Sequence, residues 1–205
     1  MMEERNAPAV TYTALGDSTG VGVGARDGKG YVARLLERIR KEREVARLNN
    51  LCVSGATTED VLRGQVTPAI RTRPTLITLG IGINDIGHGM PPERFARNYE
   101  EIIKRLKTET SAQIVVTNIP DISYAPVIPR SEHESLRRRI NAFNEKIHAI
   151  AESYQLHMVD AYSETHKVIE SHPEFFSEDG FHPSDKGYEK WAEVMWPTVQ
   201  AALSN

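Results

Sequence analysis

The chain has 205 residues, of which 40% are hydrophobic, and a formal net charge of −3 at pH 7. This length and apolar fraction predict a single domain over residues 1–205, with no room for a second large one. Because acidic and basic residues nearly balance, there is no electrostatic reason to expect nucleic acid or an anionic membrane as a partner.

The N-terminal residues 1–6 are acidic, and the apolar run that follows, residues 9–15, is interrupted by Thr and Tyr. We therefore expect no signal peptide, no membrane span and no stable membrane association. The single cysteine, Cys52, excludes an intramolecular disulfide and fits a reducing compartment. We interpret Cys52 as a buried structural thiol, and we expect a cytoplasmic location.

Short β-rich runs alternate with helical patterns along the chain. The runs typical of strands are residues 10–15, 46–53, 75–79, 114–117 and 157–159. Apolar residues recur at helical spacing in residues 30–43, 58–62, 92–107, 135–154 and 184–202. This alternation predicts an α/β fold, a doubly wound three-layer α/β/α sandwich around a five-stranded parallel sheet.

The first predicted strand ends in the segment G-D-S-T-G, residues 16–20. Ser18 lies where this strand turns towards a helix, and the flanking glycines permit a tight turn. A serine at such a point can offer both its hydroxyl and its backbone N–H to a ligand. Taken alone, a serine in a glycine-rich turn is more often a residue of an ordinary turn.

Near the C-terminus, Asp179 and His182 are three residues apart across a glycine, just before the last predicted helix. A turn of this spacing can fold the carboxylate back to the imidazole Nδ1–H, which leaves Nε2 free to take a proton. A helix-entry turn would explain Ser184 or Asp185 as a cap. It gives no reason for Asp179 and His182.

Two further strand ends offer hydrogen-bond donors. Gly55 follows the second predicted strand and, lacking a Cβ, can bring its backbone N–H close to a ligand. Asn84 follows the third predicted strand, and its side-chain amide stays neutral at all working pH values. Each residue alone fits a turn or a cap. Together with Ser18 they lie at the carboxyl ends of neighbouring predicted strands, where a doubly wound fold forms its site.

Four segments of the chain resemble, in order, the four sequence blocks of the SGNH/GDSL hydrolase superfamily. They are G-D-S at 16–18, N-L-C-V-S-G-A-T-T at 50–58, G-I-N-D at 82–85 and D-G-F-H-P at 179–183. The resemblance implies a flavodoxin-like fold, with Ser18 as nucleophile, His182 as general base and acid, and Asp179 orienting His182. It also implies an oxyanion hole made of the Ser18 N–H, the Gly55 N–H and the Asn84 side chain.

The predicted function is therefore serine carboxylic-ester hydrolysis through an acyl-enzyme, with no cofactor and no metal. Because we find neither a lid domain nor an amphipathic membrane segment, we expect small, short-chain acyl esters as substrates. Lysophospholipids, acyl thioesters and O-acetylated sugars remain alternatives with the same mechanism. A non-catalytic binding module on this fold is an alternative of another class. The sequence leaves the oligomeric state open.

Other motifs carry less weight. The G-x-S-x-G pattern around Ser18 also fits the nucleophile elbow of α/β-hydrolases, but that elbow normally follows several strands. The glycines at 20, 22 and 24 lack the third glycine of a dinucleotide loop, and the histidines form no known metal-ligand spacing. His88, in the glycine-rich loop after Asn84, is expected to be an exposed loop residue. The Pro-rich stretch 120–130 fits either a substrate-shaping loop or an ordinary surface connection.

Overall fold

A computed structural model of the chain describes residues 9–204 and has a five-stranded parallel sheet at its centre. The strands are β1 (Val10–Gly16), β2 (Ala46–Asn50), β3 (Leu76–Gly80), β4 (Gln113–Thr117) and β5 (His157–Val159). Their order, β2-β1-β3-β4-β5, is that of flavodoxin-like doubly wound sheets. The predicted fold class is confirmed. The acidic residues 1–6 lie outside the described residues.

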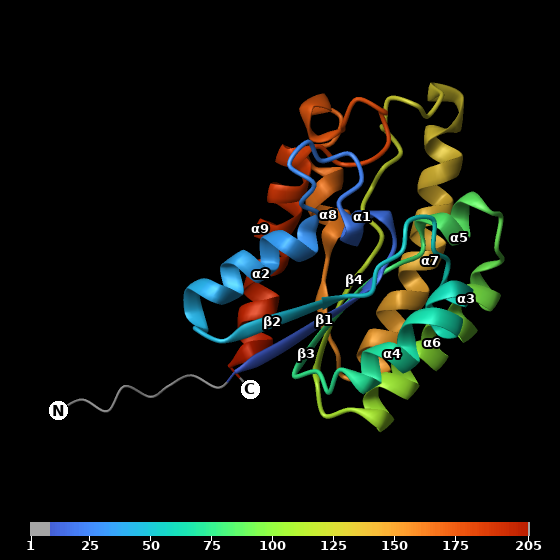
Figure 1. The fold of residues 1–205 in the computed structure, drawn as a ribbon. Helices are drawn as coiled ribbons and strands as arrows, with labels where there is room; N and C mark the ends of the chain where they lie inside the picture. The colour runs from blue at the N-terminus through green and yellow to red at the C-terminus, as the bar shows by residue number, and fades with distance from the viewer. Residues whose placement is uncertain (1–8, 205) are drawn as a thin grey trace.

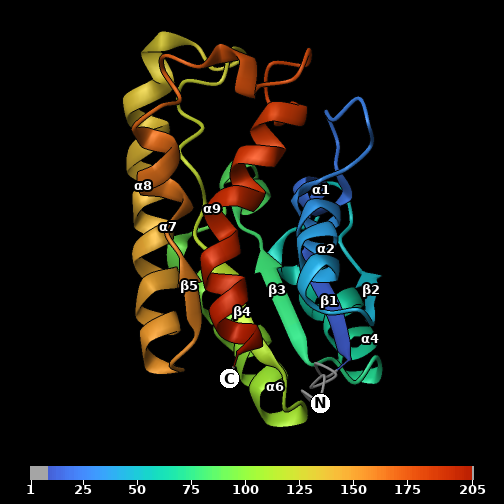
Figure 2. The same ribbon diagram turned by 90° about the vertical axis from the view of Figure 1, so that its left-hand side faces the viewer.

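Helices cover both faces of the sheet. On one face lie α2 (Tyr31–Glu42) and α9 (Asp185–Leu203), and on the other lie α4 (Val66–Arg71), α6 (Pro92–Glu109) and α7 (His133–Ser153) (Figure 1). In Figure 2 the molecule is turned so that α2 and α9 stand in front of the strands. Within residues 9–204, no helix combines the length and apolar character needed to cross a bilayer.

The three central strands, β1, β3 and β4, are buried on both faces and are rich in apolar residues, whereas the edge strands β2 and β5 are only partly buried. In β1, Tyr12 and Ala14 join the core beneath α2 and α9, whereas Leu15 joins the core beneath α6 and α7. In β4, Val115 faces the first core and Val116 the second. The two-residue period of a strand therefore divides each run between two separate cores.

Several short elements complete the fold. They are α1 (Ser18–Val21), α3 (Thr58–Asp60), the π-helical turn η1 (Val61–Gln65), α5 (Ile83–Gly87), the 3₁₀ turn η2 (Arg130–Glu132), α8 (Ala161–His166) and the 3₁₀ turn η3 (Pro173–Phe175). The helices α1, α4, α5 and α8 were not predicted, because none spans more than two turns and a periodic apolar pattern needs more. The helix predicted at 58–62 instead runs through η1 into α4.

The predicted end of the second strand was wrong by three residues, because β2 stops at Asn50. The Asn50 side chain accepts a hydrogen bond from the Cys52 N–H at 3.2 Å and donates one to the Gly20 carbonyl at 2.9 Å. The Leu51 and Val53 N–H groups still donate to the Ala14 and Gly16 carbonyls of β1, at 2.9 and 3.1 Å. Residues 51–57 therefore form a loop that stays attached to the carboxyl edge of the sheet.

Candidate active site

Ser18 follows the strand at which the strand order of the sheet reverses. β1 lies between β2 and β3, so the connection from β1 runs to one side and the later strands lie on the other, and a crevice forms at such a switch point. Asp17 begins α1 as its N-cap, because its Oδ1 accepts hydrogen bonds from the Thr19 N–H at 2.9 Å and the Thr19 hydroxyl at 2.8 Å. Burial raises the pKa of Asp17, and the two hydrogen bonds from Thr19 oppose that rise. The next residue, Ser18, is 5% exposed.

The end of β1 is held by a side chain that the sequence did not reveal. Gln65 is buried in η1 and bonds both polar groups of the Gly16 backbone, accepting from the N–H at 2.9 Å and donating to the carbonyl at 2.8 Å. On its other side, Gly16 lies so close to Gly80 that a Cβ would come within 2.4 Å of the Gly80 carbonyl oxygen. Gly16 is therefore fixed two residues before Ser18. No local pattern signals this contact, since it joins residues 49 positions apart.

Ser18, His182 and Asp179 form a continuous hydrogen-bonded chain. His182 Nε2 lies 3.0 Å from Ser18 Oγ, and His182 Nδ1 lies 2.6 Å from Asp179 Oδ2. The second oxygen of Asp179 accepts three more hydrogen bonds, from Ser177 Oγ at 2.8 Å, the Phe181 N–H at 2.8 Å and the His182 N–H at 2.9 Å. The turn therefore folds the carboxylate back onto the imidazole.

These contacts fix the direction of the hydrogen bonds. Burial opposes the ionisation of Asp179, but hydrogen bonds from the Phe181 and His182 N–H groups, the His182 ring and Ser177 lower its pKa below the ordinary value. A carboxylate can only accept, and so the hydrogen of the imidazole lies on Nδ1. Nε2 is then an acceptor for the Ser18 hydroxyl, as a general base requires.

Gly55 lies in a turn at the exposed rim of the sheet. The Ala56 N–H donates to the Val53 carbonyl at 3.1 Å and closes the turn, in which Gly55 has a φ of 79°. A Cβ at Gly55 would meet no atom within 4 Å. It is the left-handed backbone, and not crowding, that favours glycine here.

Asn84 lies in the first turn of α5, and a hydrogen bond joins its side chain to the turn that contains Gly55. Its Nδ2 donates to the Ala56 carbonyl at 2.9 Å, which leaves the second hydrogen of the amide available. The next residue, Asp85, is buried and accepts from Thr58 at its hydroxyl (2.5 Å) and its N–H (3.1 Å). Burial raises the pKa of Asp85, against these hydrogen bonds from Thr58. Two links therefore fix Gly55 relative to Asn84.

Within residues 9–204, no hydrogen bond joins Gly55 or Asn84 to the Ser18–His182–Asp179 chain. The structure thus brings the five predicted residues together as two groups. One is the hydrogen-bonded chain, and the other is a pair of donors held by the loops after β2 and β3.

An apolar pocket adjoins Ser18 and His182, with a cavity of about 100 Å³. Its walls come from the ends of β3 and β4, from α8, from residues 175–183 and from α9. The apolar side chains that line it include Ile81, Ile83, Ile119, Ile122, Val168, Ile169, Phe175, Phe176, Phe181, Trp191 and Val194. On α9, Gly187, Trp191 and Val194 follow one another at helical spacing, so the pocket runs for roughly 10 Å along that helix.

The Pro-rich stretch 120–130 takes part in this pocket. Its first residues, Pro120, Asp121 and Ile122, line the wall. Asp121 is buried, and its Oδ2 lies 2.7 Å from His166 Nδ1 on α8. Further along, the Val127 N–H donates to the Gly180 carbonyl at 3.3 Å, so the stretch also touches the loop that carries His182. Of the two interpretations of this stretch, the structure favours the one in which it shapes the site.

Other residues singled out in the sequence lie apart from these groups. The Cys52 thiol packs against the backbone of Gly20, where a Cβ would come within 2.3 Å of Sγ, and burial raises its pKa. His88 is exposed at the end of α5. In the part of the chain that the structure describes, no group of three or more His, Cys, Asp or Glu side chains is placed to hold a metal ion.

Comparison with known proteins finds relatives that match most of this chain. The curated relatives include Esterase TesA of Pseudomonas aeruginosa, which is 24% identical over 199 residues, covering 97% of this chain and 92% of the relative. Another is the acetylxylan esterase of Geobacillus stearothermophilus, 26% identical over 171 residues, covering 78% of this chain and 76% of the relative.

Solved structures show the same fold. The crystal structure of TesA superposes with a TM-score of 0.76 at 25% identity, covering 94% of this chain and 99% of that one. The structure of Axe2, an acetylxylan esterase from Geobacillus stearothermophilus, superposes with a TM-score of 0.79 at 20% identity, covering 95% and 96% of the two chains. The model of the GDSL-like lipase/acylhydrolase family matches residues 14–190. This chain is therefore an ester hydrolase that belongs to the GDSL-like lipase/acylhydrolase family.

Proposed function

We propose that this protein hydrolyses carboxylic esters through an acyl-enzyme on Ser18. The hydrogen-bonded chain from Ser18 through His182 to Asp179, beside an apolar pocket, is the observation that carries the proposal. Ser18 Oγ attacks the acyl carbonyl while His182 Nε2 takes its proton. His182 returns that proton to the leaving alcohol, and the ester bond to Ser18 remains. A water molecule, activated by His182 in the same way, then releases the acid and restores the Ser18 hydroxyl.

The negative charge that forms on the carbonyl oxygen needs donors, and we assign this role to the N–H groups of Ser18 and Gly55 and the amide of Asn84. The links from α5 to the turn at Gly55 support the assignment, because they hold the two donors rigidly before any substrate arrives. Donors that need no reorganisation stabilise the transition state more than the bound ester.

Replacing Asn84 by Ala is expected to lower kcat by about 10²- to 10³-fold with little change in KM, because the amide acts on the oxyanion. Steady-state hydrolysis of a p-nitrophenyl ester measures both constants. Asn98→Ala is the matched control, since the Asn98 amide donates to Thr58 Oγ at 3.2 Å behind the same loops. An equal loss in both variants would assign Asn84 a structural role.

The acyl group of the substrate is proposed to lie in the apolar pocket between β4, α8 and α9. The walls of this pocket are mainly apolar, and its small volume supports short acyl esters over long ones. Hydrolysis of p-nitrophenyl esters from acetate to long acyl chains, with EDTA present, tests the proposal. Turnover by the wild type that is lost in Ser18→Ala supports it, and no turnover of any ester by folded wild-type protein contradicts it.

Replacing Val194 by Phe is expected to shift the preference towards shorter acyl chains, because the larger ring fills the far end of the pocket. For the hexanoate ester kcat/KM should fall by about 10- to 100-fold, while for the acetate ester it should stay within about twofold. Val45→Phe is the control, because Val45 is 51% exposed and precedes β2 at the opposite edge of the sheet. If Val194→Phe lowered kcat/KM equally for every ester of the series, the proposal that the acyl group lies in this pocket would be wrong.

O-acetylated sugars are a second candidate substrate class, favoured by the similarity to the acetylxylan esterase of Geobacillus stearothermophilus. The same ester series separates the two classes. Activity confined to the acetate ester, together with release of acetate from acetylated xylo-oligosaccharides, would support the sugar ester. Activity that rises from acetate to butyrate or hexanoate would support a simple acyl ester.

A further inference from the structure

Ser18 and His182 come from opposite ends of the chain, 164 residues apart, yet lie 3.0 Å from each other. Ser18 follows a central strand, whereas His182 lies in an irregular loop before α9. The sheet fixes the position of Ser18, but among residues 9–204 no hydrogen bond runs from the sheet to that loop. Besides the Val127–Gly180 bond, the loop is held near Ser18 by contacts with the segment that follows α1.

The segment between α1 and α2, residues 22–30, connects the two; we call it the strap. It begins on the nucleophile, because the N–H groups of Gly22 and Val23 donate to the Ser18 carbonyl at 2.9 and 3.1 Å. Its ends meet in a closed neck, in which a Cβ on Gly22 would lie 2.4 Å from the Gly30 nitrogen. The strap is thus a compact loop with both ends fixed beside Ser18.

The middle of the strap packs directly on the loop that carries His182. At Gly24, which has a φ of 92°, an added Cβ would come within 2.8 Å of the His182 Cβ, the Pro183 carbonyl oxygen and the Ser177 hydroxyl. Backbone and loop are therefore in van der Waals contact with no room for a side chain. A shift of the strap towards the loop would therefore displace His182.

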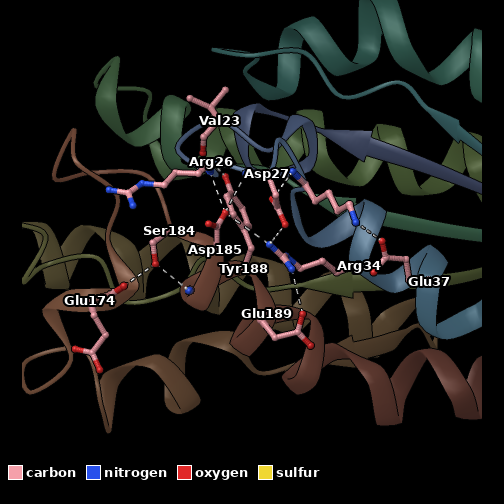
Figure 3. A network of polar contacts seen from close by, with 12 residues as sticks. Val23, Arg26, Asp27, Arg34, Glu37, Glu174, Ser184, Asp185, Tyr188 and Glu189 are labelled. Carbon is pink, nitrogen blue, oxygen red and sulfur yellow. Dashed lines mark hydrogen bonds and ion pairs between the residues drawn. The ribbon is translucent and has the colours of Figure 1, made fainter.

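Polar contacts hold the strap down on α9 (Figure 3). The Tyr188 hydroxyl donates to the Val23 carbonyl at 2.7 Å. Asp185 Oδ1 accepts from the backbone N–H groups of Arg26 at 2.9 Å and Asp27 at 3.4 Å. Each bond joins the backbone of the strap to a side chain in the first turn of α9.

Arg34 on α2 lies at the centre of these contacts (Figure 3). Its side chain is 11% exposed and its guanidinium faces three carboxylates: Asp27 of the strap at 2.8 Å, and Glu189 and Asp185 of α9 at 3.2 and 3.8 Å. Without this cation, the three acids would repel one another across the junction. The ion pairs Arg26–Glu178 and Lys29–Glu37 are much more exposed and contribute little.

We propose that Arg34 is a positioning residue, which holds the strap on α9 and so keeps His182 within reach of Ser18. The inference rests on the proposed function, because it concerns the geometry of that same reaction. An error of about 1 Å in the placement of a reacting group can cost roughly 100-fold in rate. Arg34 therefore governs turnover without touching the substrate.

The test compares Arg34→Met with the control Arg38→Met. Arg38 also lies on α2 and pairs with Glu189, but its loss leaves the contacts of the strap intact. We expect Arg34→Met to lower kcat by about 10- to 100-fold with KM within about twofold, and Arg38→Met to change neither constant. The rate at which a fluorophosphonate ester labels Ser18 should fall in parallel with kcat, because His182 activates Ser18 in both reactions. Arg34→Lys, which keeps the charge, should recover part of the loss.

Urea denaturation gives the folded fraction of each variant, to which the rates are normalised. If Arg34→Met does not fold, Asp27→Asn replaces it in the test. That change removes the charge with which the strap pairs with Arg34, at a side chain that is partly exposed. Normalised rates that stay within about twofold of wild type, or an equal loss in Arg38→Met, would overturn the role of Arg34. The proposed function fails differently, because wild-type protein would then neither hydrolyse esters nor be labelled at Ser18.

Discussion

Replacing Ser18 by Ala is expected to lower kcat for ester hydrolysis by about 10⁵- to 10⁶-fold, because no other group can form the acyl-enzyme. The stability of the fold should change by only about 1 kcal/mol, since the hydroxyl has a single hydrogen-bond partner, His182. The measurements are the initial rate with a p-nitrophenyl ester and the free energy of unfolding in urea.

The control for this variant is the titration of active sites with a fluorophosphonate ester. Wild-type protein should bind one equivalent covalently, and Ser18→Ala should bind none. If folded Ser18→Ala retained more than about a hundredth of the wild-type rate, Ser18 would not be the nucleophile.

For Asp179→Asn we expect a loss of about 10⁴-fold in kcat at neutral pH, through the wrong tautomer of His182. Three donors, from Ser177, Phe181 and the His182 backbone, point at one oxygen of Asp179. The oxygen of the new amide must face these donors, and its NH₂ group must then face His182 Nδ1. Because two donors cannot pair, the imidazole hydrogen moves to Nε2, which can no longer accept the Ser18 proton.

Ser177→Ala serves as the matched variant, because it removes one of the three donors and leaves the carboxylate in place. Its kcat should fall by less than about tenfold, consistent with the loss of one hydrogen bond. If Asp179→Asn were as active as Ser177→Ala, the orientation of His182 would not depend on the charge of residue 179.

The two halves of the proposed site differ in how far the sequence could predict them. Asp179 and His182 are neighbours in the chain, and a local turn brings them together, so their spacing predicts their hydrogen bond. Their contact with Ser18 crosses 164 residues, and the sequence suggested it only through the order of four motifs. Gln65 and Arg34 gave no signal, because each acts on residues far from it in the chain.

The sequence by itself determined the α/β class, the five strands and the long helices, because the period of apolar residues along a segment reports directly on its local geometry. It also placed Ser18, Gly55 and Asn84 at the ends of strands. Only the tertiary structure decided the pocket along α9, the clamp of Gln65 on Gly16 and the strap between Ser18 and His182. These features depend on side chains that meet only after the sheet has formed, and no period along the chain records such meetings.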